Sequence, residues 1–302
     1  MFALNSQNYQ EGQVKDHQDG ISVDAESLFS IQKVLPKLEE VSLNEKEVMM
    51  LWHEKSEEAL LHNIKCLQLY CFHNANELDT LPFAFLLNVP NMETLAIACS
   101  DFKEIFPSQK LEGEYIRKLA QLKGLRLVNL SQLSTIGLEH SWKDRLCENL
   151  EVLQIQRCPR LTNIVQSAVS FSSLKELLIN QCHGLECLFT SSKAKSLVRL
   201  KEMCIEECKS IKEIVAKEED ESTQDEIIFE HLIKISLNSL PYLTTFHTGN
   251  SSLKLPSLHK VIITQCPKII NFSQGSISAP ILLGIQVSQD DFKIMCFACV
   301  IL

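Results

Sequence analysis

The chain has 302 residues, of which 45% are hydrophobic and 22% are charged, and its formal net charge at pH 7 is −9. This acidic balance argues against a general nucleic-acid binder, because such proteins draw their affinity from clustered Lys and Arg side chains. The sequence also contains no apolar run as long as a membrane span, which needs about 20 predominantly apolar residues.

The chain opens with a polar segment, residues 1–26, in which no period is visible. We expect a disordered or fraying lead-in there. Its first 22 residues lack the basic start and the apolar run of a secretory signal. The twelve cysteines are therefore expected to stay reduced, and the sequons at Asn129, Asn250 and Asn271 are expected to be unmodified.

From residue 27 to residue 288 one spacing of apolar residues recurs, L-x-x-L-x-L, with successive copies starting 24 to 32 residues apart. The copies begin at Leu38, Ile64, Met92, Leu122, Leu150, Leu174, Leu200, Leu232, Leu258 and Leu282. Within each copy the middle residues alternate apolar and polar, which is the periodicity of a strand. A unit this short cannot bury its own apolar face and must stack on a copy of itself.

The period predicts one elongated domain, an α/β leucine-rich-repeat solenoid wound as a curved right-handed superhelix. Its concave side is expected to be a parallel β-sheet of about ten short strands, and its convex side to consist of loops, 3₁₀ turns and short helices, since prolines limit helix length there. The expected strands contain the apolar pairs Val41/Leu43, Leu67/Leu69, Leu95/Ile97, Leu125/Leu127, Leu153/Ile155, Leu177/Ile179, Met203/Ile205, Ile235/Leu237, Val261/Ile263 and Ile285/Val287.

The repeat pattern is clearest between residues 147 and 211, where a cysteine follows the expected strand in three successive repeats. Four repeats carry this cysteine, as Cys158, Cys182, Cys208 and Cys266. A small side chain at this position faces the interior, so we expect these thiols to pack in the core. A metal site is not expected, because the close pair Cys204 and Cys208 has no second pair at suitable spacing.

The longest step between repeats contains an acidic run, residues 216–226, with the sequence AKEEDESTQDE. Because like charges repel and extend a chain, we expect a solvated loop. The alternative is a docking loop for a basic partner surface. A small basic patch precedes the run and is its candidate intramolecular counterpart, formed by Lys193, Lys195, Arg199 and Lys201.

The chain ends with an apolar tail, residues 289–302, that does not continue the repeat. Its last four residues, CVIL, match the C-a-a-X pattern, and the terminal leucine favours geranylgeranylation of Cys299. The match is short and lacks the polybasic stretch that usually assists, so the alternative is an unmodified apolar remnant. Membrane association is expected only if Cys299 is prenylated.

Several distinct units occur in order, among them LEVLQIQRCPRL, LKEMCIEECKSIKEIVAKEEDE and LPSLHKVIITQCPKIINFSQG. They resemble the leucine-rich-repeat region of plant coiled-coil-type nucleotide-binding leucine-rich-repeat (NLR) disease-resistance proteins, over residues 27–288. The resemblance implies a non-catalytic protein-recognition module in the cytoplasm. Its partner would be a pathogen effector, a guarded host protein or the nucleotide-binding domain of the same receptor, which the repeats hold inactive.

One hallmark of that family is missing from the sequence. No G-x-x-x-x-G-K-[ST] phosphate loop occurs anywhere in the chain, so nucleotide binding is not carried over and no cofactor is expected. The chain is interpreted as the sensing part of a receptor, either as a fragment or as a truncated member acting alone. The Gly-x-Ile-Pro element of outward-facing plant receptors is also missing, which favours the cytosolic class.

The concave face, meaning the side of the sheet turned away from the core, is the predicted binding surface. In each repeat, the residues just before, between and just after the second and third apolar positions point out of this face. The candidate binding residues are Arg126, Gln154, Gln156, Leu178, Asn180, Cys204, Glu206, Ile262 and Thr264. Leu178, Cys204 and Ile262 are apolar where solvent is expected, and apolar surface with a polar rim is typical of a protein-binding patch.

An enzyme is not expected. The nine histidines show no repeated partnership with Cys, Ser or carboxylates, and neither a nucleophile elbow nor a metalloprotease helix occurs. Two other functions stay open at this point: the substrate-recognition repeats of an F-box-type ubiquitin ligase, and a general protein-interaction scaffold. The F-box alternative needs a helical adaptor-binding segment before the repeats, and residues 1–26 are too short and too polar for one.

Overall fold

The computed structural model describes residues 37–53, 61–73, 83–106, 113, 117, 119–136, 144–164, 170–218 and 225–287. The expected lead-in, the apolar tail with Cys299 and the middle of the acidic run lie outside these residues.

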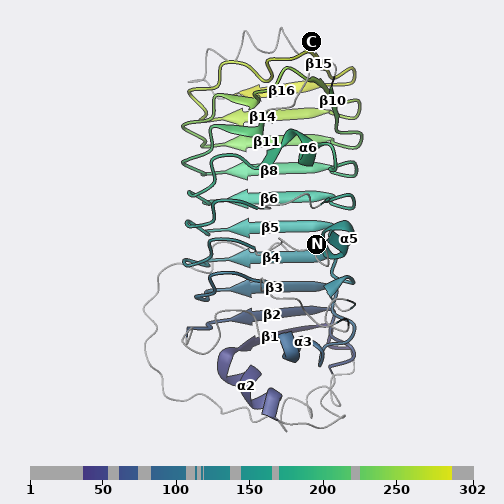
Figure 1. The fold of residues 1–302 in the computed structure, drawn as a ribbon, viewed down its shortest axis with the longest axis vertical. Coiled ribbons are helices and arrows are strands. Elements are labelled where there is room, and N and C mark those ends of the chain that lie inside the picture. The colour runs from purple at the N-terminus through teal and green to yellow at the C-terminus, as the bar shows by residue number, and fades with distance from the viewer. Residues whose placement is uncertain are drawn as a thin grey trace.

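Ten short strands lie side by side in one parallel sheet and stack along the long axis of the molecule (Figure 1). In sheet order they are β1 (Glu40–Asn44), β2 (Cys66–Tyr70), β3 (Thr94–Ala98), β4 (Gly124–Val128), β5 (Val152–Gln156), β6 (Glu176–Asn180), β8 (Glu202–Glu206), β11 (Lys234–Asn238), β14 (Lys260–Thr264) and β16 (Gly284–Val287). The order in the sheet follows the order in the chain, so each turn contacts only the turns before and after it. The predicted leucine-rich-repeat solenoid with its ten-stranded parallel sheet is confirmed.

The predicted apolar pairs lie opposite each other in adjacent strands. Leu153 of β5, for example, is in register with Leu125 of β4 and Leu177 of β6. All three side chains are at most 1% exposed, because alternate residues of a strand point to the same side of the sheet. Each strand therefore buries its leucines against the neighbouring turns rather than within its own turn.

From β2 to β14, each strand of the sheet is followed by one residue with a positive φ, between 47° and 57°. These residues are Cys71, Cys99, Asn129, Arg157, Gln181, Glu207, Ser239 and Gln265. A left-handed backbone costs a non-glycine residue roughly 1–2 kcal/mol. The next turn offsets part of this, since the N–H of Arg157, for example, donates to the Asn180 carbonyl at 2.9 Å.

The strand β1 ends differently and runs directly into α2 (Glu45–His53). Asn44 and Glu47 cap this helix reciprocally. The N–H of Glu47 donates to Asn44 Oδ1 at 3.1 Å, and the N–H of Asn44 donates to Glu47 Oε2 at 2.7 Å. The helix lies at the β1 end of the stack (Figure 1), with Val48 fully buried.

The cysteine position that was predicted to face the interior does so. Cys158, Cys182, Cys208 and Cys266 are fully buried free thiols. Each thiol donates to the carbonyl two residues earlier, as Cys208 Sγ does to Glu206 O at 3.3 Å. The thiol thereby satisfies a backbone acceptor at the turn, which is why a small polarisable side chain suits this position.

The convex side contains short helices, as expected, and in addition two small parallel sheets that the pattern did not predict. The helices are α3 (Phe83–Leu86), α5 (Asp144–Asn149) and α6 (Ser191–Ala194). One sheet consists of β7 (Phe189–Thr190), β9 (Glu213–Ala216) and β12 (Thr245–His247), and the other of β10 (Glu226–Ile228), β13 (Ser252–Lys254) and β15 (Ile277–Ser278). Strands of two to four residues are too short to show an alternation in sequence.

Phenylalanines from successive turns stack in the core. The rings of Phe246 and Phe272 are nearly parallel, with centroids 4.5 Å apart, and Phe229 meets Phe246 edge-on at 6.3 Å. Offset-stacked and edge-on rings both add to the stabilisation that burial provides. None of the helices in the described part of the chain is long and apolar enough to cross a membrane.

Both described flanks of the acidic run contact the basic segment that precedes it. Lys195 Nζ lies 3.8 Å from Asp225 Oδ2. The Glu218 carboxylate accepts hydrogen bonds from the backbone N–H and the hydroxyl of Ser192, on α6. An intramolecular counterpart for the run is thus present at Lys195.

Candidate protein-recognition site

The sheet register places all nine candidate binding residues on the concave face. The middle column runs Arg126, Gln154, Leu178, Cys204, Ser236 and Ile262 across β4 to β14. The column beside it runs Gln156, Asn180, Glu206, Asn238 and Thr264. Ser236 and Asn238 of β11 complete these columns and were not among the candidates, although they occupy the same positions of the repeat.

The three apolar candidates are only partly exposed, and they do not form one patch. Leu178 and Cys204 are direct neighbours, whereas Ser236 separates Cys204 from Ile262. Adjacent strands lie about 4.8 Å apart, so each side chain is shielded by those on the strands beside it. Large apolar side chains with high exposure occur instead outside the sheet, as at Ile270, which is 75% exposed.

Polar side chains of the concave face form hydrogen bonds with one another. Asn180 Nδ2 donates to Glu206 Oε2 at 3.4 Å, and Thr264 Oγ1 donates to Asn238 Oδ1 at 2.8 Å. Cys204 Sγ donates to Glu206 Oε1 at 3.4 Å. Burial, reinforced by the Glu206 charge, raises the pKa of the Cys204 thiol to about 11. Cys204 is therefore a neutral, weakly nucleophilic group at neutral pH.

A shallow hollow of about 790 Å³ borders this face where the strands end, along the positive-φ residues of the C-terminal turns. It is lined by Gln181, His183, Glu207, Lys209, Ser239, Pro241, Gln265 and Pro267. Arg157 Nε donates to Gln181 Oε1 at 2.9 Å, and Gln181 Nε2 donates to Glu207 Oε2 at 2.6 Å, so the side chains of successive turns form a chain of hydrogen bonds. In the sequence, this row of side chains could have been found only by aligning the residue that directly follows each strand.

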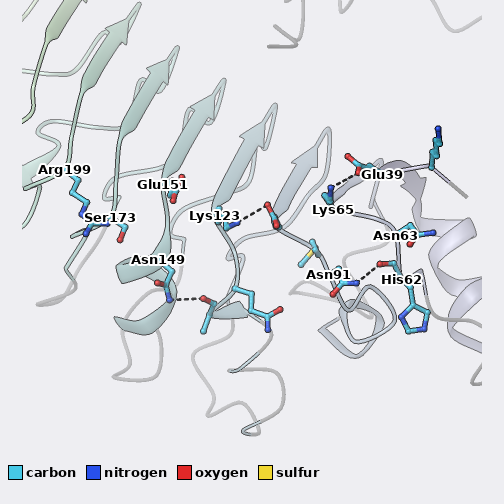
Figure 2. A pocket seen from close by; sticks show the side chains of 15 residues that line it. Glu39, His62, Asn63, Lys65, Asn91, Lys123, Asn149, Glu151, Ser173 and Arg199 are labelled. Carbon is cyan, nitrogen blue, oxygen red and sulfur yellow. Dashed lines mark hydrogen bonds and ion pairs between the residues drawn. The ribbon is translucent and has the colours of Figure 1, made fainter.

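A groove of about 1180 Å³ follows the opposite edge of the sheet, where the strands begin (Figure 2). One position of the repeat alternates in charge along it. Ion pairs join Glu39 to Lys65 at 2.6 Å, Glu93 to Lys123 at 3.2 Å and Glu151 to Lys175 at 2.7 Å. The hydrogen bond that Lys65 donates to the Glu39 carboxylate, together with the negative charge of Glu39, raises the pKa of Lys65.

Amides along the same groove contact the backbone of the preceding turn. Asn91 Nδ2 donates to His62 O at 2.7 Å, and Asn149 Nδ2 donates to Ala120 O at 2.9 Å (Figure 2). Much of the polar lining is therefore committed to partners within the chain. We assign this groove a role in holding successive turns in register, to which each exposed ion pair makes only a small contribution.

The side chains of His247 and Ser251 form a contact that lies in the core, away from the surface. His247 Nε2 and Ser251 Oγ are 2.8 Å apart, and both residues are fully buried. A substrate has no access to this hydroxyl, so the pair serves to satisfy buried polar groups. In the described part of the chain, no three His, Cys, Asp or Glu side chains come together as metal ligands would.

Comparison with known families assigns the chain to one of them. The family model described as plant disease resistance protein RPS2-like, leucine-rich repeats, matches residues 37–170 and 165–278, which is more than half of the chain. A search of curated proteins finds no match. The chain belongs to the family of leucine-rich repeats of RPS2-like plant disease resistance proteins.

Proposed function

We propose that this chain is the non-catalytic recognition module of a plant intracellular immune receptor and acts in the cytoplasm, either within a receptor or as a truncated family member. Its concave face binds a protein: a pathogen effector, a guarded host protein or the nucleotide-binding domain of the same receptor. The observation that carries the proposal is the continuous, in-register face of side chains presented by a chain of this family.

The composition of this face supports a protein ligand. Backbone groups of the strands are paired within the sheet, so recognition falls to side chains. Leu178 and Cys204 form an apolar centre, and Gln154, Asn180 and Glu206 surround it. An apolar centre inside a polar rim is the usual anatomy of a protein interface.

The face is tested with the double variant Leu178→Glu and Ile262→Glu. Panels of pathogen effectors, host proteins and NLR nucleotide-binding domains are screened for binding to the purified chain, and dissociation constants of the binders are measured by calorimetry. A carboxylate desolvated in the interface without a partner is strongly unfavourable. We expect the double variant to bind at least about 100-fold more weakly, which corresponds to roughly 2.8 kcal/mol.

The matched control is Ile270→Glu, which introduces the same group on an exposed turn outside the sheet. We expect its affinity to stay within about twofold of the parent value, as for a surface position outside an interface. Binders that tolerate the double variant, with circular dichroism and urea unfolding unchanged, would place recognition on another surface.

A further inference from the structure

Two cysteines are neighbours in the row of positive-φ residues that follows the strands. Cys71 follows β2 and Cys99 follows β3, with φ angles of 57° and 47°. The residues before them, Tyr70 and Ala98, are in register in the sheet. The N–H of Cys71 donates to the Ala98 carbonyl at 3.2 Å, so the pairing of the two chains continues beyond the strands. Cys71 and Cys99 therefore occupy the same position of consecutive turns.

Side chains in this row contact those of the adjacent turns. Ser239 Oγ, which is on a side chain as short as that of cysteine, donates to Gln265 Oε1 of the next turn. Cys99 takes part in such a contact itself, because its Sγ accepts a hydrogen bond from Asn129 Nδ2 at 3.6 Å. The row thus directs side chains of successive turns toward one another, and at Cys71 and Cys99 both side chains are thiols.

The spacing of the two turns suits a disulfide bond. Neighbouring strands lie about 4.8 Å apart, and disulfides usually join residues whose Cα atoms are about 4.4–6.8 Å apart. A bond between Cys71 and Cys99 therefore requires rotation of the two side chains but no unfolding of either turn. Burial raises the pKa of the Cys71 thiol, and the Cys99 thiol raises it further, so the two sulfur atoms are within electrostatic range of each other.

The two thiols differ in their access to solvent. Both are free, and Cys71 is exposed whereas Cys99 is partly exposed. The cysteines of the core position, in contrast, are fully buried. A small oxidant in solution therefore meets Cys71 first and finds Cys99 beside it as the second thiol. The hydrogen bond from Asn129 favours the thiolate form of Cys99, which is the form that reacts.

We propose that Cys71 and Cys99 are a modification site at which a peroxide produces a disulfide bond between consecutive turns. The Cys71 thiolate attacks one oxygen of hydrogen peroxide; an S–O bond forms, the O–O bond breaks and hydroxide leaves. The Cys99 thiolate then attacks the Cys71 sulfur; the S–S bond forms, the S–O bond breaks and a second hydroxide leaves. The hydroxides take up the two thiol protons, so two thiols and one peroxide give one disulfide and two waters.

The disulfide joins the turns of β2 and β3 at the N-terminal end of the stack. In the reduced protein, hydrogen bonds and packing hold these turns together. A cross-link restricts the unfolded chain more than the folded one. We expect the oxidised protein to unfold at a higher urea concentration than the reduced protein, and dithiothreitol to reverse the difference. Equal urea midpoints would contradict this consequence.

The test treats the purified full chain with hydrogen peroxide, alkylates the remaining thiols and maps cysteine peptides by mass spectrometry without reduction. We expect a monomer in which the peptides of Cys71 and Cys99 are joined, and we expect dithiothreitol to separate them. Because the thiolate reacts, the bond should form faster as the pH rises towards the ordinary thiol pKa of 9.0.

Three results would overturn the proposal. The first is that Cys71 and Cys99 are alkylated as fully after peroxide as before it. The second is a disulfide that joins Cys71 to the Cys71 of another molecule. The third is oxidation of Cys71 to a sulfinic acid while Cys99 stays free, because a resolving thiol within reach prevents this step.

Two controls separate a placed pair from the chance reaction of thiols. In the chain unfolded in urea the twelve cysteines have no fixed neighbours, so cross-links should be spread over many pairs. Equal selectivity in the folded and unfolded chains would overturn the proposal. Cys99→Ser should remove the cross-link and the rise in urea midpoint, and should leave a Cys71 sulfenic acid that dimedone traps.

The matched control is Cys187→Ser, which removes a partly exposed free thiol of another turn. We expect this variant to form the disulfide between Cys71 and Cys99 at the parent rate. Loss of the cross-link in Cys187→Ser, with an unchanged circular dichroism spectrum, would assign the oxidation to a different pair and overturn the site.

Discussion

At the scale of single residues, the buried residue that follows each strand, such as Cys208 or Ser100, links consecutive turns when its side chain is polar. The N–H of Cys182 donates to Cys208 Sγ at 3.4 Å, and the Cys208 thiol donates in turn to its own strand end. Ser100 is both acceptor and donor in an earlier turn. Its Oγ accepts a hydrogen bond from the N–H of Phe72 at 3.1 Å and donates one to Ala98 O at 2.8 Å. The role therefore requires a small group that both donates and accepts, which a hydroxyl performs as well as a thiol.

Cys208→Ala and Cys208→Ser test this role. Alanine leaves a buried N–H and a carbonyl without their side-chain partner, so we expect the free energy of unfolding in urea to fall by about 1–3 kcal/mol. Serine keeps both hydrogen bonds and should lose less than alanine. Equal losses for the two variants would show that only the volume of the sulfur matters at this position.

At the scale of elements, successive turns approach so closely that some backbone positions tolerate no side chain. A Cβ on Gly184, in the turn after β6, would lie 2.6 Å from Leu161 O and 2.8 Å from Pro159 O. Both atoms belong to the backbone of the preceding turn, which its own hydrogen bonds hold in place. Gly184 is thus required by the stacking of turns rather than by its own conformation.

Gly184→Ala is expected to lower the free energy of unfolding by about 1–3 kcal/mol, as overpacking does in a rigid interior. Gly284→Ala is the matched control, because a Cβ there meets no atom within 4 Å, and its stability should change by less than about 0.5 kcal/mol. Urea unfolding of both variants measures the difference. An unchanged Gly184→Ala midpoint would mean that the two turns separate at little cost.

At the scale of the whole molecule, the solenoid shields many thiols at once. The pKa is raised at Cys66, Cys71, Cys182, Cys187, Cys204 and Cys208, with burial the largest cause at every one except Cys182, where the hydrogen bond with Cys158 is larger. It reaches about 11 at Cys204 and about 12 at Cys208. Thiols of the unfolded chain ionise from an ordinary pKa of 9.0.

Linkage between ionisation and folding then predicts the direction of the pH dependence. Above pH 9 the unfolded chain releases thiol protons that the folded chain retains, so stability contributed by these groups is complete below pH 9 and is lost as the pH rises towards the folded values of about 11 and 12. We expect urea midpoints to fall as the pH rises from about 9 towards 11. The variant carrying Cys204→Ser and Cys208→Ser should decline less steeply, and a decline as steep as that of the parent would contradict the assignment.

Much of the architecture was determined by the sequence itself. The spacing L-x-x-L-x-L recurs, and a strand turns alternate side chains to opposite sides, so the pattern alone specified which residues enter the core and which lie on the concave face. Leu153 and its neighbours Leu125 and Leu177 could be aligned before any contact was known. The cysteine position followed from the same repetition.

The tertiary structure decided everything that depends on which side chains the adjacent turns bring together. Leu178 and Ile262 were expected in solvent, yet neighbours about 4.8 Å away shield them. Residues 24 to 32 positions apart in the chain come into contact only when the turns stack. This stacking pairs Glu93 with Lys123 and packs the backbone of the preceding turn against Gly184. Among the described residues, it also buries the Nε of Arg126 without a hydrogen bond. The repeat pattern specifies to which side of the sheet each side chain points. Burial, charge pairing and hydrogen bonding depend on two or more turns together.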